Sequence, residues 1–259
     1  FVAGYVSASR FSVYAALNPA IQNQWIKCML LTASVFPLGV LVTGFMLNFV
    51  AIAYDSAQAI PFGGMVVMLL IWLLGVIPLC FAGTIVGRMR RPSKADLPRV
   101  HQVPRLIPQQ PWYFETTALA IAGGVMPFGS IFIELYFVFT SFWGYTTYYV
   151  YGFVLLVFVM LLFVTACVTV VACYFMLNSE EHRWQWASFT VGGSVSGYVF
   201  LYAAYFYWFK THMTGFFMFA FYFTYMAMLS AALTLLCGAV GFSAASLFVT
   251  RIFRNVKCD

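Results

Sequence analysis

The chain has 259 residues, of which 63% are hydrophobic, 20% are aromatic and only 8% are charged. A soluble domain carries about 25% charged residues, so this composition excludes an ordinary soluble protein and indicates an integral membrane protein. The net charge of +6 does not indicate a nucleic-acid partner, because the basic residues gather at the ends of apolar segments, where membrane topology explains them.

The first segment, residues 1–8, has the composition of the last turns of a transmembrane helix. The chain opens on FVAGYVSAS without an initiator Met. It shows neither a basic stretch nor a small-residue cleavage site, which argues against a signal peptide. We therefore expect an earlier span to begin before this sequence, and we interpret the chain as the C-terminal part of a longer protein.

Six later segments are long enough to cross a bilayer, which takes about 20 apolar residues for a helix. Each is continuously apolar rather than alternating, which indicates helices and not the strands of a barrel. The last is long for one crossing and too short for two, so we expect one tilted or protruding helix. The predicted fold class is all-α, a polytopic helical membrane protein with six complete transmembrane helices plus the end of an earlier one. The predicted spans are approximately residues 26–53, 65–87, 117–142, 150–177, 187–209 and 216–249.

The loops between these spans differ sharply in their Lys and Arg content. Of 13 basic residues, only Lys210 lies in the set of loops on one side, and the others lie on the opposite side. Lys and Arg accumulate in the loops that face the cytosol. We therefore predict that the loop at 88–116 and the tail at 250–259 are both cytosolic.

The loop at 88–116 is basic and rich in proline. Prolines fix φ, remove N–H donors and favour extended backbone, so we expect a stiff strap that re-enters the headgroup region at aromatic anchors. This strap is either a rigid connector between two helices or a docking surface for a partner. The residues of this loop motif are Pro104, Pro108, Pro111, Trp112 and Tyr113.

Prolines also lie well inside three predicted spans, at Pro37, Pro78 and Pro127, where they predict kinks. Pro127 is followed by Gly129, and Glu134 in the same span is the most deeply placed ionisable residue of the sequence. A carboxyl group inside a membrane is costly, and it indicates a functional site or a hydrogen-bonded acid. Three roles stay open for Glu134: structural packing, recognition of a client or lipid, and coupling to an ion or proton.

Three pairs of small residues are spaced four apart within the predicted spans. A lack of side-chain bulk allows helix backbones to approach closely. The pairs serve either for packing within the chain or for a lateral groove that receives a client helix. They are Gly83 with Gly87, Gly193 with Gly197, and Gly241 with Ala245.

Little in the sequence indicates catalysis or metal binding. The three histidines lie in separate loops, and no H-E-x-x-H or G-x-S-x-G motif occurs. The six cysteines include no C-x-x-C pair, which argues against a zinc site or a disulfide framework. We expect no catalytic residues, no metal site, no cofactor and no enzymatic activity.

Two long motifs resemble the nonaspanins, the transmembrane 9 superfamily: PRLIPQQPWYF in the loop and GGVMPFGSIFIELYFVFTSFW in the following span. Shorter motifs agree in the same order, namely GYVSAS, AIPFGG, NSEEHRWQWASF and RNVKCD. The resemblance covers essentially the whole chain, with two departures: Gln109 stands where the family commonly has Glu, and the loop at 9–24 is less basic than usual. It implies that residues 1–259 form the C-terminal transmembrane domain of a nine-span protein with a large lumenal N-terminal domain.

The resemblance also implies a function. It suggests a non-enzymatic protein of Golgi and endosomal membranes that takes part in the sorting, trafficking and membrane localisation of other transmembrane proteins, including clients with glycine-rich spans. It further implies a terminal Lys-x-Asp signal read by the coatomer coat, matched here by Lys257 and Asp259. The alternative hypothesis is an ion- or proton-coupled transporter or channel that uses Glu134 and the proline-kinked spans.

Overall fold

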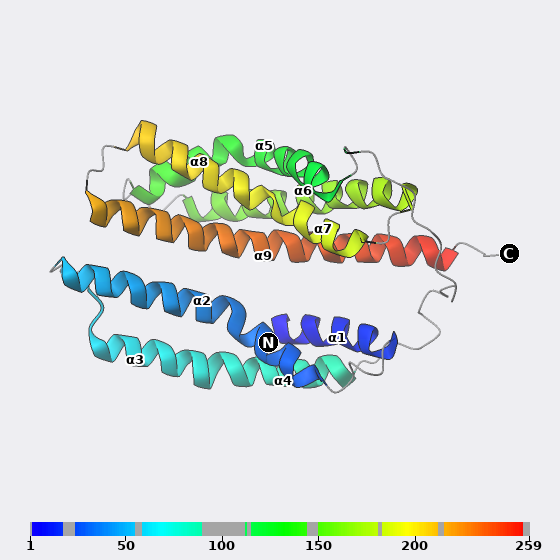
Figure 1. The fold of residues 1–259 in the computed structure, drawn as a ribbon, viewed down its shortest axis with the longest axis horizontal. Helices are drawn as coiled ribbons and strands as arrows, with labels where there is room; N and C mark the ends of the chain where they lie inside the picture. Colours follow the sequence, from blue (N-terminus) through cyan, green and yellow to red (C-terminus); the bar gives the residue numbers. More distant parts are fainter. Residues whose placement is uncertain are drawn as a thin grey trace. The chain divides into compact units, whose positions relative to one another are not determined.

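The computed structural model describes residues 2–17, 24–54, 59–89, 112, 115–143, 150–180, 183–211 and 215–255. All regular secondary structure in these ranges is helical, which confirms the predicted all-α fold class (Figure 1). The chain divides into two compact units: unit 1 comprises residues 1–97 and 214–224, and unit 2 comprises residues 98–213 and 225–259.

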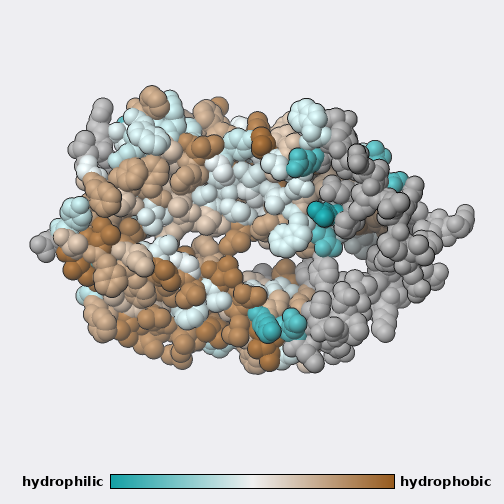
Figure 2. All heavy atoms as spheres, in the orientation of Figure 1, coloured by the Kyte–Doolittle hydropathy of each residue, from teal (hydrophilic) through white to brown (hydrophobic). Residues whose placement is uncertain are grey.

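Within the described part of the chain, five helical segments are long and apolar enough to cross a membrane. Their outer faces carry large apolar side chains such as Phe62, Leu74 and Phe163, whose exposed fractions are 80%, 68% and 71%. Hydrophobic residues cover much of the visible surface in Figure 2. A soluble protein rarely exposes so much apolar surface, so these faces are suited to lipid. The five segments are Trp25–Ala53, Phe62–Met89, Thr116–Phe137, Val154–Asn178 and Phe216–Phe253.

Unit 1 is built from α1 (Val2–Leu17), α2 (Trp25–Ala53), α3 (Phe62–Ile71), the π-helical turn η2 (Trp72–Val76) and α4 (Ile77–Met89).

Two of the predicted proline positions lie in this unit. Pro37 lies within α2, which bends in its N-terminal half in Figure 1. Pro78 has no N–H to donate to the carbonyl of Leu74, and its ring crowds that carbonyl. The π-helical turn η2 ends two residues before Pro78, and we attribute this local widening of the helix to the proline.

Close packing of α1 on α4 depends on glycine. A Cβ added to Gly87 would lie 2.6 Å from the carbonyl oxygen of Tyr5 and 3.1 Å from the Cβ of Ala8. A Cβ at Gly4 would meet the carbonyl oxygen of Cys80. The backbones of α1 and α4 therefore approach too closely for a side chain at either position.

Unit 2 contains α5 (Thr116–Trp143), α6 (Val150–Asn178), α7 (Trp184–Gly193), α8 (Val195–Lys210) and the larger part of α9 (Phe216–Asn255).

The hydrophobic core of unit 2 lies where α5, α6, α8 and α9 meet. Ile131 and Leu135 from α5 pack with Leu161, Val199 and Cys237, one each from the other three helices. All of these side chains are buried. This core holds α5, which carries Pro127 and Glu134, against the rest of unit 2.

The predicted span at 187–209 is not a single helix, because α7 ends at Gly193 and α8 begins at Val195. The N–H of Gly197 donates to the carbonyl of Ser194 at 3.0 Å, a tighter i to i+3 bond. Two side chains satisfy carbonyls near the break: the Ser194 hydroxyl donates to Val191 at 2.8 Å and the Ser196 hydroxyl donates to Gly193 at 2.7 Å. A membrane helix tolerates such an interruption when nearby hydroxyls satisfy the freed carbonyls.

The final segment, α9, runs as one helix of 40 residues. At 1.5 Å per residue it is about 60 Å long, roughly twice the thickness of a bilayer core. A single helix of this length must tilt or protrude. Its residues up to Thr224 belong to unit 1 and the later ones to unit 2.

Candidate functional site

The helices α5 and α8 pack together and carry four of the intramembrane residues that the sequence singled out: Pro127, Gly129, Glu134 and Gly197. Pro127 is fully buried. Next to it, the ring of Phe128 stacks on the ring of Tyr198 with their centroids 5.7 Å apart. The Tyr198 hydroxyl donates to the carbonyl of Ile121 at 2.8 Å, which ties α8 to α5 a second time. We call this pair of helices, with its aromatic contacts, the α5–α8 surface.

Glu134 lies on α5, one position before the buried Leu135. Its side chain is half-buried. Among the residues that the structure describes, none forms a hydrogen bond or ion pair with this carboxyl group. Because an unpaired carboxyl group at a membrane-embedded position is costly, Glu134 stays a candidate functional residue.

Two of the predicted glycines have free space next to their backbone. Gly129 and Gly197 are exposed, and a Cβ added to either would meet no heavy atom within 4 Å. Each adjoins one ring of the stacked pair, since Gly129 follows Phe128 and Gly197 precedes Tyr198. The α5–α8 surface therefore offers two places where a second helix can approach a bare backbone.

The other predicted glycines are occupied by packing inside the chain. Gly83 and Gly87 are buried in α4, and Gly87 contacts α1 as described above. A Cβ at Gly193 would lie 3.1 Å from Cγ2 of Thr234 in α9. A Cβ at Gly241 would lie 2.7 Å from Cγ2 of Thr169 in α6 and 3.2 Å from the carbonyl oxygen of Ser188 in α7. These positions favour the packing interpretation over a client groove.

Sequence reasoning missed a chain of hydroxyl groups that links α8 to α9. The hydroxyls of Ser196 and Thr234 lie 2.6 Å apart, and Ser230 donates to the carbonyl of Ser196 at 3.1 Å. The signal was present in the sequence as Ser and Thr inside apolar spans, which commonly hydrogen-bond between membrane helices. Because these bonds are satisfied within the chain, the network stabilises the fold and leaves no free polar group for a ligand.

Several predicted site residues lie outside the described part of the chain. These are the loop residues Pro104, Pro108, Pro111 and Tyr113, and the tail residues Lys257 and Asp259. Trp112 is described and is highly exposed, as an interfacial anchor would be. The roles predicted for the loop and the tail stay predictions.

No group of three or more His, Cys, Asp or Glu side chains able to hold a metal ion occurs among the described residues. The described cysteines, Cys28, Cys80, Cys167, Cys173 and Cys237, are free thiols.

Long apolar helices, outward-facing hydrophobic side chains and small residues at the helix contacts define a polytopic helical membrane protein. Residues 1–216 match the family model described as endomembrane protein 70. The chain belongs to this family, the transmembrane 9 superfamily or nonaspanins, as its motifs predicted.

Curated relatives match over essentially the whole chain. It is 39% identical to transmembrane 9 superfamily member 4 of Arabidopsis thaliana, over 100% of this chain and 42% of that protein. It is 40% identical to member 2 of the same plant, over 100% of this chain and 43% of that protein. It is 35% identical to human member 2, over 99% of this chain and 38% of that protein. The chain thus spans about two-fifths of the length of these relatives. No solved structure matches it.

Proposed function

We propose that this protein acts in the sorting, trafficking and membrane localisation of other transmembrane proteins, in Golgi and endosomal membranes and without enzymatic activity. The observation that carries this proposal is the α5–α8 surface, with its open Gly129 and Gly197. In membranes, helices associate largely through small residues that allow close approach. A client with a glycine-rich span has the shape that fits such a surface.

The division of the glycines supports this assignment. Gly87, Gly193 and Gly241 meet neighbouring helices of the same chain, so they have no room for a further helix. Gly129 and Gly197 have that room. Because Gly129 and Gly197 adjoin the stacked rings of Phe128 and Tyr198, we assign the proposed client site to the α5–α8 surface.

Crosslinking within the membrane tests the proposal. Full-length protein would be co-expressed with a single-span reporter that carries either a glycine-rich or a leucine-rich span. We expect preferential capture of the glycine-rich reporter and its loss, by roughly fivefold for about 1 kcal/mol of packing, in the double variant Gly129→Leu and Gly197→Leu.

The matched control is Gly39→Leu, because Gly39 is equally open but lies in unit 1. This control should leave capture unchanged. Equal loss in the control and the double variant, or equal capture of both reporters, would contradict a client site on α5–α8.

The competing hypothesis is ion- or proton-coupled transport through Glu134. The observation that favours it is the half-buried carboxyl group without a polar partner among the described residues. Transport requires a flux into proteoliposomes that disappears in Glu134→Gln, whose side chain is isosteric but cannot carry the charge. We expect no such flux; a proton-dependent flux lost in Glu134→Gln would replace the sorting proposal.

A further inference from the structure

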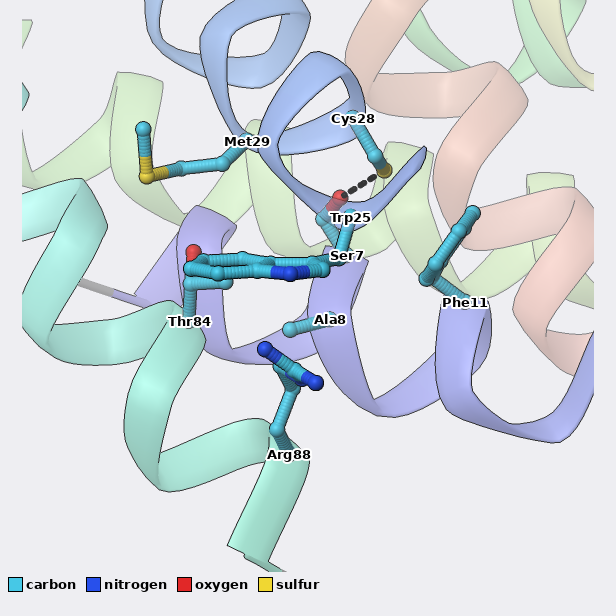
Figure 3. Close-up of a pocket in the computed structure, with 8 residues that line it drawn as sticks. All are labelled: Ser7, Ala8, Phe11, Trp25, Cys28, Met29, Thr84 and Arg88. Carbon is cyan, nitrogen blue, oxygen red and sulfur yellow. Dashed lines mark hydrogen bonds between the residues drawn. The ribbon is translucent and has the colours of Figure 1, made fainter. Parts of the chain in front are cut away.

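A hollow between α1, α2 and α4 at one end of unit 1 belongs to none of the sites discussed so far. Its lining comes from three helices, as Figure 3 shows. Most of the lining is apolar or weakly polar, with a single cationic group, the guanidinium of Arg88. The polar residues of the lining are Ser7, Trp25, Cys28, Thr84 and Arg88.

Two hydrogen-bond donors line this hollow, the Arg88 guanidinium and the Trp25 indole N–H. The guanidinium carbon of Arg88 lies 4.3 Å from the centre of the Trp25 ring, so the cation is held over the indole face. In the described part of the chain, neither the Arg88 guanidinium nor the Trp25 indole N–H has a hydrogen-bond acceptor, and no carboxylate pairs with Arg88. Both groups can donate but not accept, so they suit an anion.

The remaining polar groups of the hollow are already engaged. The Ser7 hydroxyl lies 2.8 Å from the Thr32 hydroxyl and 3.4 Å from the Cys28 sulfur, and Thr84 donates to the carbonyl of Cys80 at 2.8 Å. These bonds leave Arg88 and Trp25 as the free polar groups among the residues that line the hollow. Among the described residues that line the hollow, no free hydrogen-bond acceptor opposes the binding of an anion.

The position along the helices indicates where the anion comes from. Trp25 is the first residue of α2, and Arg88 is the penultimate residue of α4. At 29 residues, α2 is about 43 Å long against a hydrocarbon core of about 30 Å, so its ends reach the headgroup region. The neighbouring residues Ile26 and Met89 have exposed apolar side chains, which are suited to contact with lipid.

We propose that Arg88 and Trp25, which line this hollow, bind the phosphate of an anionic membrane lipid. The guanidinium of Arg88 donates to phosphate oxygens, the Trp25 N–H contributes a further donor, and the acyl chains lie along the apolar faces of α2 and α4. The planar guanidinium suits a phosphate because two of its N–H groups bind two oxygens together. The exposed Lys27 on the same turn of α2 raises the local concentration of anionic lipid without lining the hollow.

Native mass spectrometry of the full-length protein in detergent tests this proposal. Dioleoylphosphatidic acid and dioleoylphosphatidylcholine would be offered at equal concentration. We expect preferential retention of one phosphatidic acid molecule, and a loss of its affinity of about tenfold in Arg88→Gln. Arg88→Lys keeps the positive charge but not the planar pair of N–H donors. We therefore expect its affinity for phosphatidic acid to lie between those of the unaltered protein and Arg88→Gln.

Matched variants separate a specific site from general charge attraction. Lys27→Gln removes an adjacent cation outside the hollow and should weaken binding by less than about twofold. If Arg88→Gln does not fold, Trp25→Phe tests the proposal instead. This variant keeps an aromatic face under Arg88 but removes the indole N–H, so we expect its affinity for phosphatidic acid to fall several-fold. Equal losses in Lys27→Gln and Arg88→Gln, no preference for phosphatidic acid, or displacement of the lipid by millimolar inorganic phosphate would each overturn the proposal.

Discussion

At the scale of single residues, Asn48 shows how one polar side chain organises a helix connection. It is almost fully buried near the end of α2. Its Nδ2 donates to the carbonyl of Ile60 at 3.1 Å, and its Oδ1 accepts from the N–H of Ile60 at 2.7 Å. A single amide thereby satisfies both backbone groups of the residue before Pro61, directly ahead of α3.

We predict that Asn48→Leu destabilises the protein by about 1–3 kcal/mol, because the N–H and C=O of Ile60 lose their partners. The measurement is the thermal unfolding midpoint of the purified protein in detergent. Thr43→Val is the matched control on the same helix, since the Thr43 hydroxyl donates to carbonyls of its own helix at Gly39 and Val40. The interpretation of Asn48 fails if both variants unfold at the same temperature.

At the scale of the elements, the glycines of α5, α7 and α9 determine how closely the helices of unit 2 approach. A Cβ at Gly192 would lie 2.7 Å from the carbonyl oxygen of Cys237, and a Cβ at Gly124 would lie 2.5 Å from Oγ of Ser194. Gly241 and Gly192 face each other across the same contact. The interruption between α7 and α8 thus lies next to a close contact between the backbones of α7 and α9.

For the same reason we predict that Gly241→Ala destabilises the protein, by about 1–3 kcal/mol of overpacking against Thr169 and Ser188. Gly44→Ala should have the opposite sign and stabilise by a few tenths of a kcal/mol up to about 1, since Gly44 is inside α2 with no heavy atom near an added Cβ. Both changes are measured by thermal unfolding in detergent. A Gly241→Ala variant as stable as Gly44→Ala would show that this helix contact can relax.

At the scale of the whole molecule, the family membership and the two helical units define a polytopic membrane protein of the transmembrane 9 superfamily. The proposed sorting role also needs a localisation signal, which the resemblance assigns to Lys257 and Asp259. A cation and carboxylates at the end of a chain can be bound by a coat subunit through charge-assisted hydrogen bonds. The tail and the α5–α8 surface therefore make separable contributions to the proposed function.

We expect Lys257→Ala in the full-length protein to move a tagged copy from the Golgi toward later compartments or the cell surface, because the cationic contact with the coat is lost. Quantitative fluorescence microscopy against a Golgi marker provides the measurement. Arg254→Ala removes the same charge outside the Lys-x-Asp pattern and should leave the distribution unchanged. An unaltered Golgi fraction in Lys257→Ala would argue against retrieval through this tail.

Much of this protein follows from its sequence alone. Uninterrupted apolar runs of 20 or more residues have to form helices in a bilayer, because only a helix satisfies its own backbone there. The all-α class therefore followed from composition, and the family followed from motifs such as GGVMPFGSIFIEL. Pro78 likewise predicted a helix irregularity, which the structure places one turn earlier as η2.

Only the tertiary structure decided which small residues pack against a neighbouring helix and which remain exposed. Gly193 and Gly197 belong to the same spacing pattern, yet Gly193 meets Thr234 and Gly197 meets nothing within 4 Å. The sequence could not separate them, because spacing places residues on one helix face but not opposite a particular neighbour. The pairing of Arg88 with Trp25 could not be predicted from the sequence for the same reason, because these two residues lie far apart in the chain.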